Sequence, residues 1–187
     1  MRLFVALEAP ATVRESLASL LQTLRAVSPQ IRWVRPENLH VTLKFIGEVP
    51  ETKLAGVRVA LASVRSEQPV TLDFRGLGFF PNEKHPRVFW AGIEASSNLK
   101  TLAADVDGVT EKLGIPRERH PFSPHLTLAR FGPPRLPEKL RAAIQENAAR
   151  EFGSLLTGKF HLIESKLKPS GAEYTTVETF PFSASEA

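Results

Sequence analysis

The sequence predicts an α+β protein of 187 residues that is internally duplicated. Two observations lead to this prediction. Strand-like and helix-like segments alternate along the chain, and the segment His-x-Thr-Leu occurs twice, at residues 40–43 and 125–128. A chain of this length is typical of one domain with its own core. We therefore expect residues 1–187 to form a single domain of two lobes.

The composition, 42% hydrophobic and 24% charged, is typical of a globular protein. The chain has no cysteine, which excludes disulfides, thiolate zinc sites and cysteine nucleophiles. Its first apolar run is interrupted by Glu8 and is too short for a signal peptide or a membrane span. We expect a cytoplasmic protein without membrane association. The net charge of +4 is compatible with a polyanionic partner but does not by itself indicate one.

The element order within the chain supports the duplication. An apolar strand, an amphipathic helix that begins with a Thr12/Glu15 capping box, and a second apolar strand follow one another and then recur. A further helix and strand follow the His-x-Thr-Leu strand within each copy, and a hairpin closes the chain. The expected strands are residues 2–8, 40–47, 70–74, 87–94, 125–132, 160–167 and 174–182. The expected helices are residues 12–27, 54–64 and 97–113, with a fourth around Leu140 and Ile144.

The two copies are related by a constant offset of 85 residues. A single match of four letters would carry little weight, whereas one offset shared by strand, helix and strand indicates an internal repeat. We place the first copy at about residues 2–80 and the second at about residues 87–167. The matched pairs include Arg2/Arg87, Phe4/Phe89, Ala6/Ala91, Leu17/Leu102, His40/His125 and Thr42/Thr127.

The repeated motif has an obvious chemical use. On a strand, residues i and i+2 face the same side, so His40 projects with Thr42, and His125 projects with Thr127. Two histidines on opposite sides of a phosphorus atom can divide the work of in-line displacement, one as base and one as acid. Threonine hydroxyls can donate hydrogen bonds to the phosphate oxygens. No carboxylate lies within either motif, so we expect no metal site.

A structural role is the competing interpretation of each motif taken alone. Histidine on a strand more often serves packing or hydrogen bonding than catalysis, and threonine is favoured in strands in any case. The repetition in register favours the catalytic interpretation.

The residues around both motifs resemble a known family. The segments RWVRPENLHVTLKFIGEV at 32–49, HPRVFWAGIE at 85–94 and PFSPHLTLAR at 121–130 are similar to segments of the two-histidine phosphoesterases. Within that superfamily they resemble the LigT-like RNA 2',3'-cyclic phosphodiesterases, also called 2'-5' RNA ligases. LIESKLKPSGAEYTTVETFPF at 162–182 is similar to the C-terminal hairpin of that family.

This resemblance implies a bilobal fold with two small, mostly antiparallel sheets that face each other across a central cleft, with helices outside. It also implies an enzyme that hydrolyses RNA 2',3'-cyclic phosphodiester ends to 2'-phosphomonoesters without a cofactor. His40 would be the proton donor, His125 the proton acceptor, and Thr42 and Thr127 would bind phosphate. Without the resemblance, the near-symmetry of the two copies leaves the assignment of acid and base open.

Arg130 matches the basic residue that ends the second motif of the family, where it would bind phosphate. Strict alternation from His125 places Arg130 on the opposite face of the strand, so this role requires the strand to bend or end near residues 131–134. A surface role for Arg130 stays open at this point.

Two alternative functions remain. The same residues could ligate RNA ends through a 2'-5' bond, which is the reverse chemistry, or the fold could serve as a non-catalytic RNA-binding module. Binding alone would favour fixed cations over histidines that are half-neutral near pH 7. The expected substrates are RNA 3' ends or small cyclic nucleotides, and we expect a monomer without an obligate protein partner.

Overall fold

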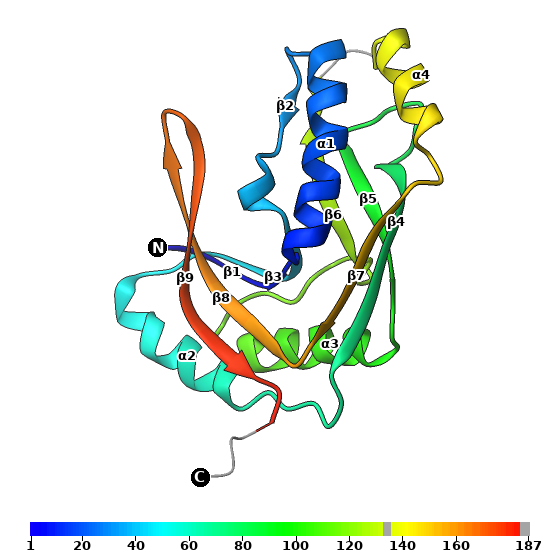
Figure 1. The fold of residues 1–187 in the computed structure, drawn as a ribbon. Coiled ribbons are helices and arrows are strands. Elements are labelled where there is room, and N and C mark those ends of the chain that lie inside the picture. Colours follow the sequence, from blue (N-terminus) through cyan, green and yellow to red (C-terminus); the bar gives the residue numbers. More distant parts are fainter. Residues whose placement is uncertain (133–135, 184–187) are drawn as a thin grey trace.

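The structure, a computed structural model, describes residues 1–132 and 136–183. Two sheets and four α-helices make up this part of the chain (Figure 1). The strands are β1 (Arg2–Glu8), β2 (Arg32–Trp33), β3 (His40–Glu48), β4 (Val70–Phe80), β5 (Val88–Ala95), β6 (His125–Arg130), β7 (Glu151–Thr157), β8 (Lys159–Lys168) and β9 (Gly171–Pro181). The helices are α1 (Ala11–Val27), α2 (Leu54–Ala62), α3 (Asn98–Glu111) and α4 (Glu138–Glu146), with short 3-10 turns η1 (Pro36–Asn38) and η2 (Glu51–Lys53).

The four-stranded sheet has the order β3-β1-β8-β9, and the five-stranded sheet has the order β2-β6-β5-β4-β7. We call them sheet A and sheet B. Neighbouring strands in both sheets pair antiparallel. This arrangement confirms the predicted α+β class with two antiparallel sheets.

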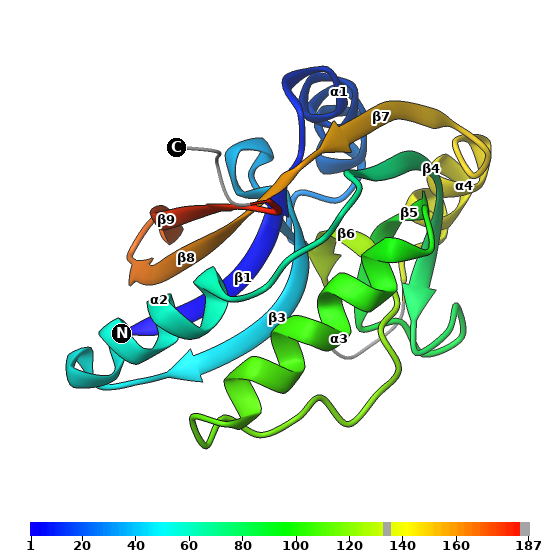
Figure 2. The same cartoon turned by 90° about the horizontal axis from the view of Figure 1, so that it is seen from below.

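The two halves of the chain are interleaved between these sheets. Sheet A combines β1 and β3 with β8 and β9 from the other end of the chain, and β4 lies beside β5 in sheet B. Helix α1 contacts β7 and α4, whereas α3 contacts β3 and α2. Figure 2 shows α2 and α3 side by side on the side of the molecule away from α1. Helix α1 of the first half therefore packs on sheet B, and helix α3 of the second half packs on sheet A.

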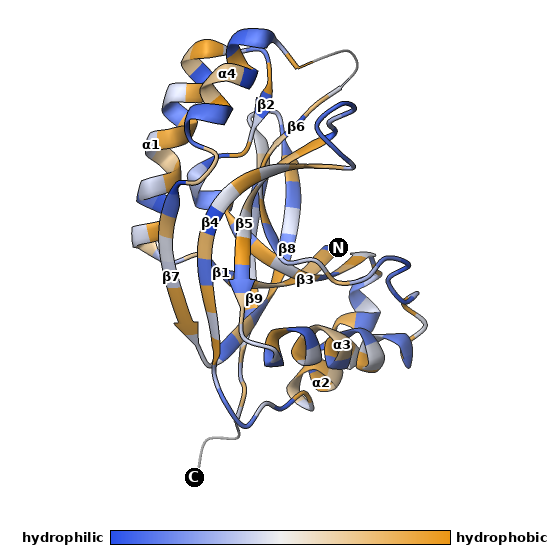
Figure 3. Ribbon diagram, turned by 90° about the vertical axis from the view of Figure 1, so that its right-hand side faces the viewer, coloured by the Kyte–Doolittle hydropathy of each residue, from blue (hydrophilic) through white to orange (hydrophobic). Residues whose placement is uncertain are grey.

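One continuous apolar core joins the helices to one face of each sheet. In β1, Leu3, Val5 and Leu7 point into this core, whereas Phe4 and Ala6 belong to a small separate cluster on the opposite face of sheet A. The alternation follows from the pleat of a strand that is covered on both sides. Figure 3 shows apolar and polar segments alternating along the helices that cover the sheets. The second face of sheet A carries this small cluster, separate from the main core.

Several local expectations differ from the structure. Helix α1 begins at Ala11 after the extended Pro10 and has no side-chain cap, so the Thr12/Glu15 capping box is wrong. Residues 75–80, which lie beyond the expected strand 70–74, extend β4. Strand β7 was not predicted, because its sequence EFGSLLT has weak alternation and its residues are ordered by pairing with β4. No helix among the described residues is long and apolar enough to cross a membrane.

Candidate functional site

The first motif begins strand β3, and a bulge follows its threonine. The partners of His40, Thr42 and Phe45 in β1 are Glu8, Ala6 and Phe4, whereas Leu43 has no partner in this register. A bulge adds one residue to a strand, so the side chains beyond it change face. His40, Thr42 and Phe45 therefore share the outer face of sheet A, which carries the Phe4 cluster.

The second motif has the same bulge at the same place. In the pairing of β6 with β5, His125 lies opposite Gly92, Thr127 opposite Trp90 and Arg130 opposite Val88, and Leu128 is the extra residue. Arg130 consequently lies on the same face as His125 and Thr127. The expectation from strict alternation is wrong here, because the bulge at Leu128 returns Arg130 to the face of His125, whereas we had expected that this would require a bend or an end of the strand near residues 131–134. Of those residues, 133 and 134 lie outside the described part of the chain.

The strand registers also correct one part of the repeat. Phe4 lies opposite Phe45 on the outer face of sheet A, whereas Phe89 lies opposite Ala129 and is buried in the core. The residue that occupies the position of Phe4 in sheet B is Val88, which corresponds to an offset of 84 in these strands. An alignment error of one residue exchanges the two faces of a strand. The duplication itself stays a prediction.

Both imidazole rings are held in the same way. Nδ1 of His40 lies 3.1 Å from the carbonyl oxygen of Asn38, and Nδ1 of His125 lies 2.8 Å from that of Ser123. A carbonyl oxygen only accepts, so each Nδ1 carries the proton and donates it. The tautomer is thereby fixed in both rings, and Nε2 is the nitrogen left for chemistry.

Aromatic side chains cover both rings. Phe4 and Tyr174 contact His40 edge to face, with ring centroids 6.1 and 5.6 Å away, and Phe80 contacts His125 at 4.9 Å. The resulting burial lowers the pKa of each histidine below its usual value, since desolvation disfavours the charged form. The hydrogen bonds to Asn38 and Ser123 oppose this effect in both rings.

Nearby charges make the two histidines different. Glu8 raises the pKa of His40, while Arg14 and His161 lower it. At His125 the guanidinium of Arg130 adds to the lowering of the pKa by burial.

The groups suited to holding a phosphate lie beside the histidines. Thr42 and Thr127 are half-buried, and within residues 1–132 and 136–183 neither hydroxyl makes a hydrogen bond. Arg130 is exposed and pairs across the strands with Arg32 of β2, a residue that the sequence did not single out. In the described part of the chain, neither arginine forms an ion pair. Their positive charge is therefore available to an anionic ligand.

Phe45 is the other residue that we did not select from the sequence. It is 59% exposed, an unusual setting for a large aromatic ring, and it packs against Phe4 beside His40. Trp33, in contrast, is a core residue whose Nε1 donates to the Ser28 carbonyl. The signal for Phe45 was present in the sequence, because Phe45 and Arg130 occupy the same position of the two copies.

The strands that carry the motifs are neighbours in space. β3 and β6 contact each other although they belong to different sheets, and the Val34 amide before η1 donates to the Leu128 carbonyl at 2.8 Å. The structure thus places the edge strand of sheet A beside the second strand of sheet B, and these two strands carry the motifs.

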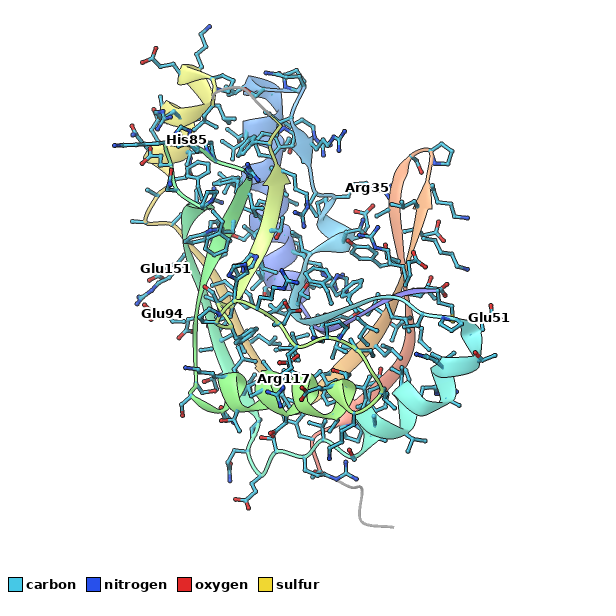
Figure 4. The ribbon with its side chains drawn as sticks, turned by 180° about the vertical axis from the view of Figure 1, so that it is seen from behind. Arg35, Glu51, His85, Glu94, Arg117 and Glu151 are labelled. Carbon is cyan, nitrogen blue, oxygen red and sulfur yellow. The ribbon has the colours of Figure 1, made fainter. Side chains whose placement is uncertain are left out.

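A cavity of about 580 Å³ adjoins His125 and spreads over the same face of sheet B. Phe80, Trp90 and Gly92 line it near the histidine. Arg75, Glu94 and Glu151 line its far side, and Figure 4 shows the last two close together on the outside of sheet B. The volume lies within the range of small-molecule sites. His40 is not among the lining residues, so the cavity belongs to the His125 side.

The remaining histidines have different surroundings. His85 is exposed in the segment between β4 and β5 (Figure 4). His161 is 6% exposed and bonds to Thr179. Among the described residues, no three His, Asp or Glu side chains are grouped as metal ligands.

Comparisons with known proteins identify the family of this chain. The family model described as LigT like Phosphoesterase matches residues 7–90 and residues 93–174, and each stretch contains one His-x-Thr-Leu segment. Proteins named RNA 2',3'-cyclic phosphodiesterase are similar over nearly the whole chain. One from Thermus thermophilus is 40% identical, covering 96% of this chain and 89% of its own. One from Methanothermobacter thermautotrophicus is 36% identical, covering 96% and 98%.

Solved structures show the same fold. A crystal structure of a Thermus thermophilus protein covers all of both chains with a TM-score of 0.75 and 36% sequence identity. The crystal structure of E. coli LigT complexed with 3'-AMP gives a TM-score of 0.75 at 27% identity, covering 98% of each chain.

Proposed function

We propose that this chain, which belongs to the LigT-like phosphoesterase family, hydrolyses 2',3'-cyclic phosphates at RNA 3' ends to 2'-phosphomonoesters. The names of its relatives support the reaction class. The observation that carries the proposal is the shared arrangement of the two histidines. Each begins its strand, donates Nδ1–H to the carbonyl two residues before it, and lies on one face with a threonine. Two histidines that are held in the same way on neighbouring strands are suited to two proton transfers at one phosphorus atom, one from water and one to the leaving oxygen.

In this mechanism the phosphate lies between the two motifs. His125 takes a proton from water through Nε2, the water oxygen bonds to phosphorus, and the bond from phosphorus to the ribose 3'-oxygen breaks. His40 gives its Nε2 proton to that departing oxygen, and the 2'-phosphate remains. Thr42 and Thr127 donate hydrogen bonds to the non-bridging oxygens.

The residues three positions after the threonines differ and would bind different parts of the substrate. Arg130 is an exposed cation suited to the two negative charges that develop on phosphate. Phe45 offers an exposed ring beside His40, on which an unstacked terminal base can stack. A nucleotide would thus be held by its phosphate and its base at once.

The test is a product assay. Purified protein is incubated with excess EDTA and an oligoribonucleotide that ends in a 2',3'-cyclic phosphate, and the position of the product phosphate is determined. We expect a 2'-phosphate from the wild-type protein and no detectable product over the same incubation time from His40→Ala or His125→Ala. The variant His85→Ala, which changes an exposed histidine outside the site, is the matched control and keeps its activity. RNA binding by wild type without any turnover would favour the binding module instead.

Ligation is a second candidate because of the cavity beside His125. A single water occupies about 30 Å³ in the liquid, far less than this cavity offers. A ribose hydroxyl of a second strand could take the place of water, and a 2'-5' bond would result. Adding an oligonucleotide with a free 5'-hydroxyl to the assay distinguishes the two reactions. A joined product in place of the 2'-phosphate would assign ligation.

A further inference from the structure

The residues directly across from the two histidines are different. Glu8 of β1 lies opposite His40, whereas Gly92 of β5 lies opposite His125. Directly opposed residues of antiparallel strands have their side chains on the same face, with Cβ atoms about 5 Å apart. A carboxylate therefore accompanies the first histidine at a position where the second has only a hydrogen atom.

The fold prevents a carboxylate at the second position. A Cβ atom on Gly92 would lie 2.5 Å from the carbonyl oxygen of Arg75, closer than such atoms approach in proteins. The chain cannot move this oxygen cheaply, because it is part of the backbone of β4. The difference between the two sides is thus built into the packing of sheet B.

Glu8 lies among several groups that face His40. On the outer face of sheet A, Nε2 of His161 in β8 lies 3.9 Å from Oε2 of Glu8, and Tyr174 of β9 contacts the His40 ring. From helix α1, Arg14 acts on His40 with the opposite sign to Glu8. Among these neighbours, the carboxylate of Glu8 is the group whose charge raises the pKa of His40.

His125 has different charged neighbours. Arg130 of β6 acts on it directly. The carboxylates of Glu94 in β5 and Glu151 in β7 lie across the cavity, and Arg75 of β4 forms an ion pair with Glu94. The charge that acts on the pKa of His125 is thus the positive one of Arg130, which lowers this pKa further after burial and favours the neutral imidazole that a general base requires.

We propose that Glu8 makes His40 the proton donor and so breaks the near-symmetry of the two motifs. This inference rests on the proposed function and assigns a role to a residue that does not touch the reacting atoms. Glu8 stabilises the imidazolium of His40 before the reaction. After His40 has given its proton to the ribose oxygen, the same carboxylate, half-exposed to solvent, favours the return of a proton from water.

The test is the pH profile of kcat/KM for wild type and Glu8→Gln, which removes the charge and keeps the shape. Loss of the carboxylate lowers the pKa of His40, so the alkaline limb of the bell-shaped profile moves to lower pH. We expect a shift of about half a pH unit, because Glu8 is partly screened by solvent. The acid limb, which reports His125, stays in place. Glu173→Gln removes a carboxylate from β9 of the same sheet and is expected to move neither limb.

Titration of the two histidine ring signals by NMR tests the same point without turnover. In Glu8→Gln the pKa of His40 falls and that of His125 is unchanged. A shift of the acid limb would reverse the assignment of acid and base. Two unmoved limbs together with an unchanged His40 titration would refute the role of Glu8. Absence of activity in the wild type would count against the proposed function, and the NMR titration would still decide whether Glu8 acts on His40.

Discussion

Strands β3 and β6 have the same backbone geometry, but the side chains around them differ. Each begins with a histidine bonded to a carbonyl two residues earlier and carries a bulge at the leucine of its motif. Beyond the bulge, β3 presents the exposed ring of Phe45 and β6 presents the cation Arg130. In the proposed function, the histidines that both strands share would carry out the proton transfers. Phe45 would bind the base, and Arg130 would bind the phosphate.

The inner faces of the two strands differ as well. The residue after the bulge is Lys44 in β3 and Ala129 in β6, and both are buried. Nζ of Lys44 donates to Oδ1 of Asp107 at 2.7 Å and to the carbonyl of Pro116 at 2.6 Å. This links β3 to α3 and to the segment that leads towards His125. The first strand is thus anchored by a buried ion pair, and the second by apolar packing at the same position.

The largest expected effect tests whether the two motifs act as one unit. His40→Ala and His125→Ala should each reduce kcat by about a thousandfold, the middle of the range for general acid and base catalysis. The double variant should lose little more than either single one, because the remaining histidine has no partner in the reaction. Single-turnover rates on a cyclic-phosphate oligonucleotide measure this. Losses that multiply in the double variant would mean that the motifs act independently.

Replacing Arg130 by Gln should lower kcat about a hundredfold, since a cation at the developing charge of the phosphate is lost. Arg130→Lys should recover only part of the rate, because an ammonium does not reproduce bidentate contact. Arg65→Gln, at an exposed arginine after α2, serves as the control. Steady-state kinetics on the same oligonucleotide give the comparison. An unchanged kcat for Arg130→Gln would return Arg130 to a surface role.

Lys44→Met tests the anchor of β3. The substitution leaves Asp107 without its buried partner, and breaking such a pair costs about 3 kcal/mol of unfolding free energy. Urea unfolding followed by circular dichroism measures this loss. Lys53→Met, at an exposed lysine of η2, should leave the midpoint unchanged. Equal midpoints for both variants would show that the ion pair contributes nothing to stability.

Phe45→Leu should have the smallest effect of this series. Loss of base stacking raises KM about tenfold for an RNA end, and Phe45→Tyr should restore it. A cyclic phosphate without a base, such as glycerol 1,2-cyclic phosphate, should be hydrolysed equally by wild type and Phe45→Leu. Val59→Ala, at another exposed apolar residue, is the control. An equal loss on both substrates would show that Phe45 supports the strand and does not select the base.

Much of the fold followed from local patterns. The apolar runs and helical spacings predicted all four helices and the strands other than β2 and β7. This was possible because the spacing of apolar residues along the sequence reflects which side chains of a helix or strand are buried. The partners of the strands were not predictable in the same way. β4 pairs with β5, and β8 pairs with β1, through backbone hydrogen bonds that leave no trace in side-chain pattern.

The candidate site was likewise predictable in part from local sequence and in part only from strand pairing. The repeated His-x-Thr-Leu letters by themselves determined which residues to examine, since a strand places i and i+2 on one face whatever surrounds it. The positions of Arg130 and Phe45 depended on the bulges at Leu128 and Leu43, which only the pairing of strands creates. The placement of Glu8 across from His40 likewise came from the register of β1. Sequence determined the chemical groups available, and tertiary structure decided which of them share a face, because register is set by cross-strand pairing and not by neighbours in the chain.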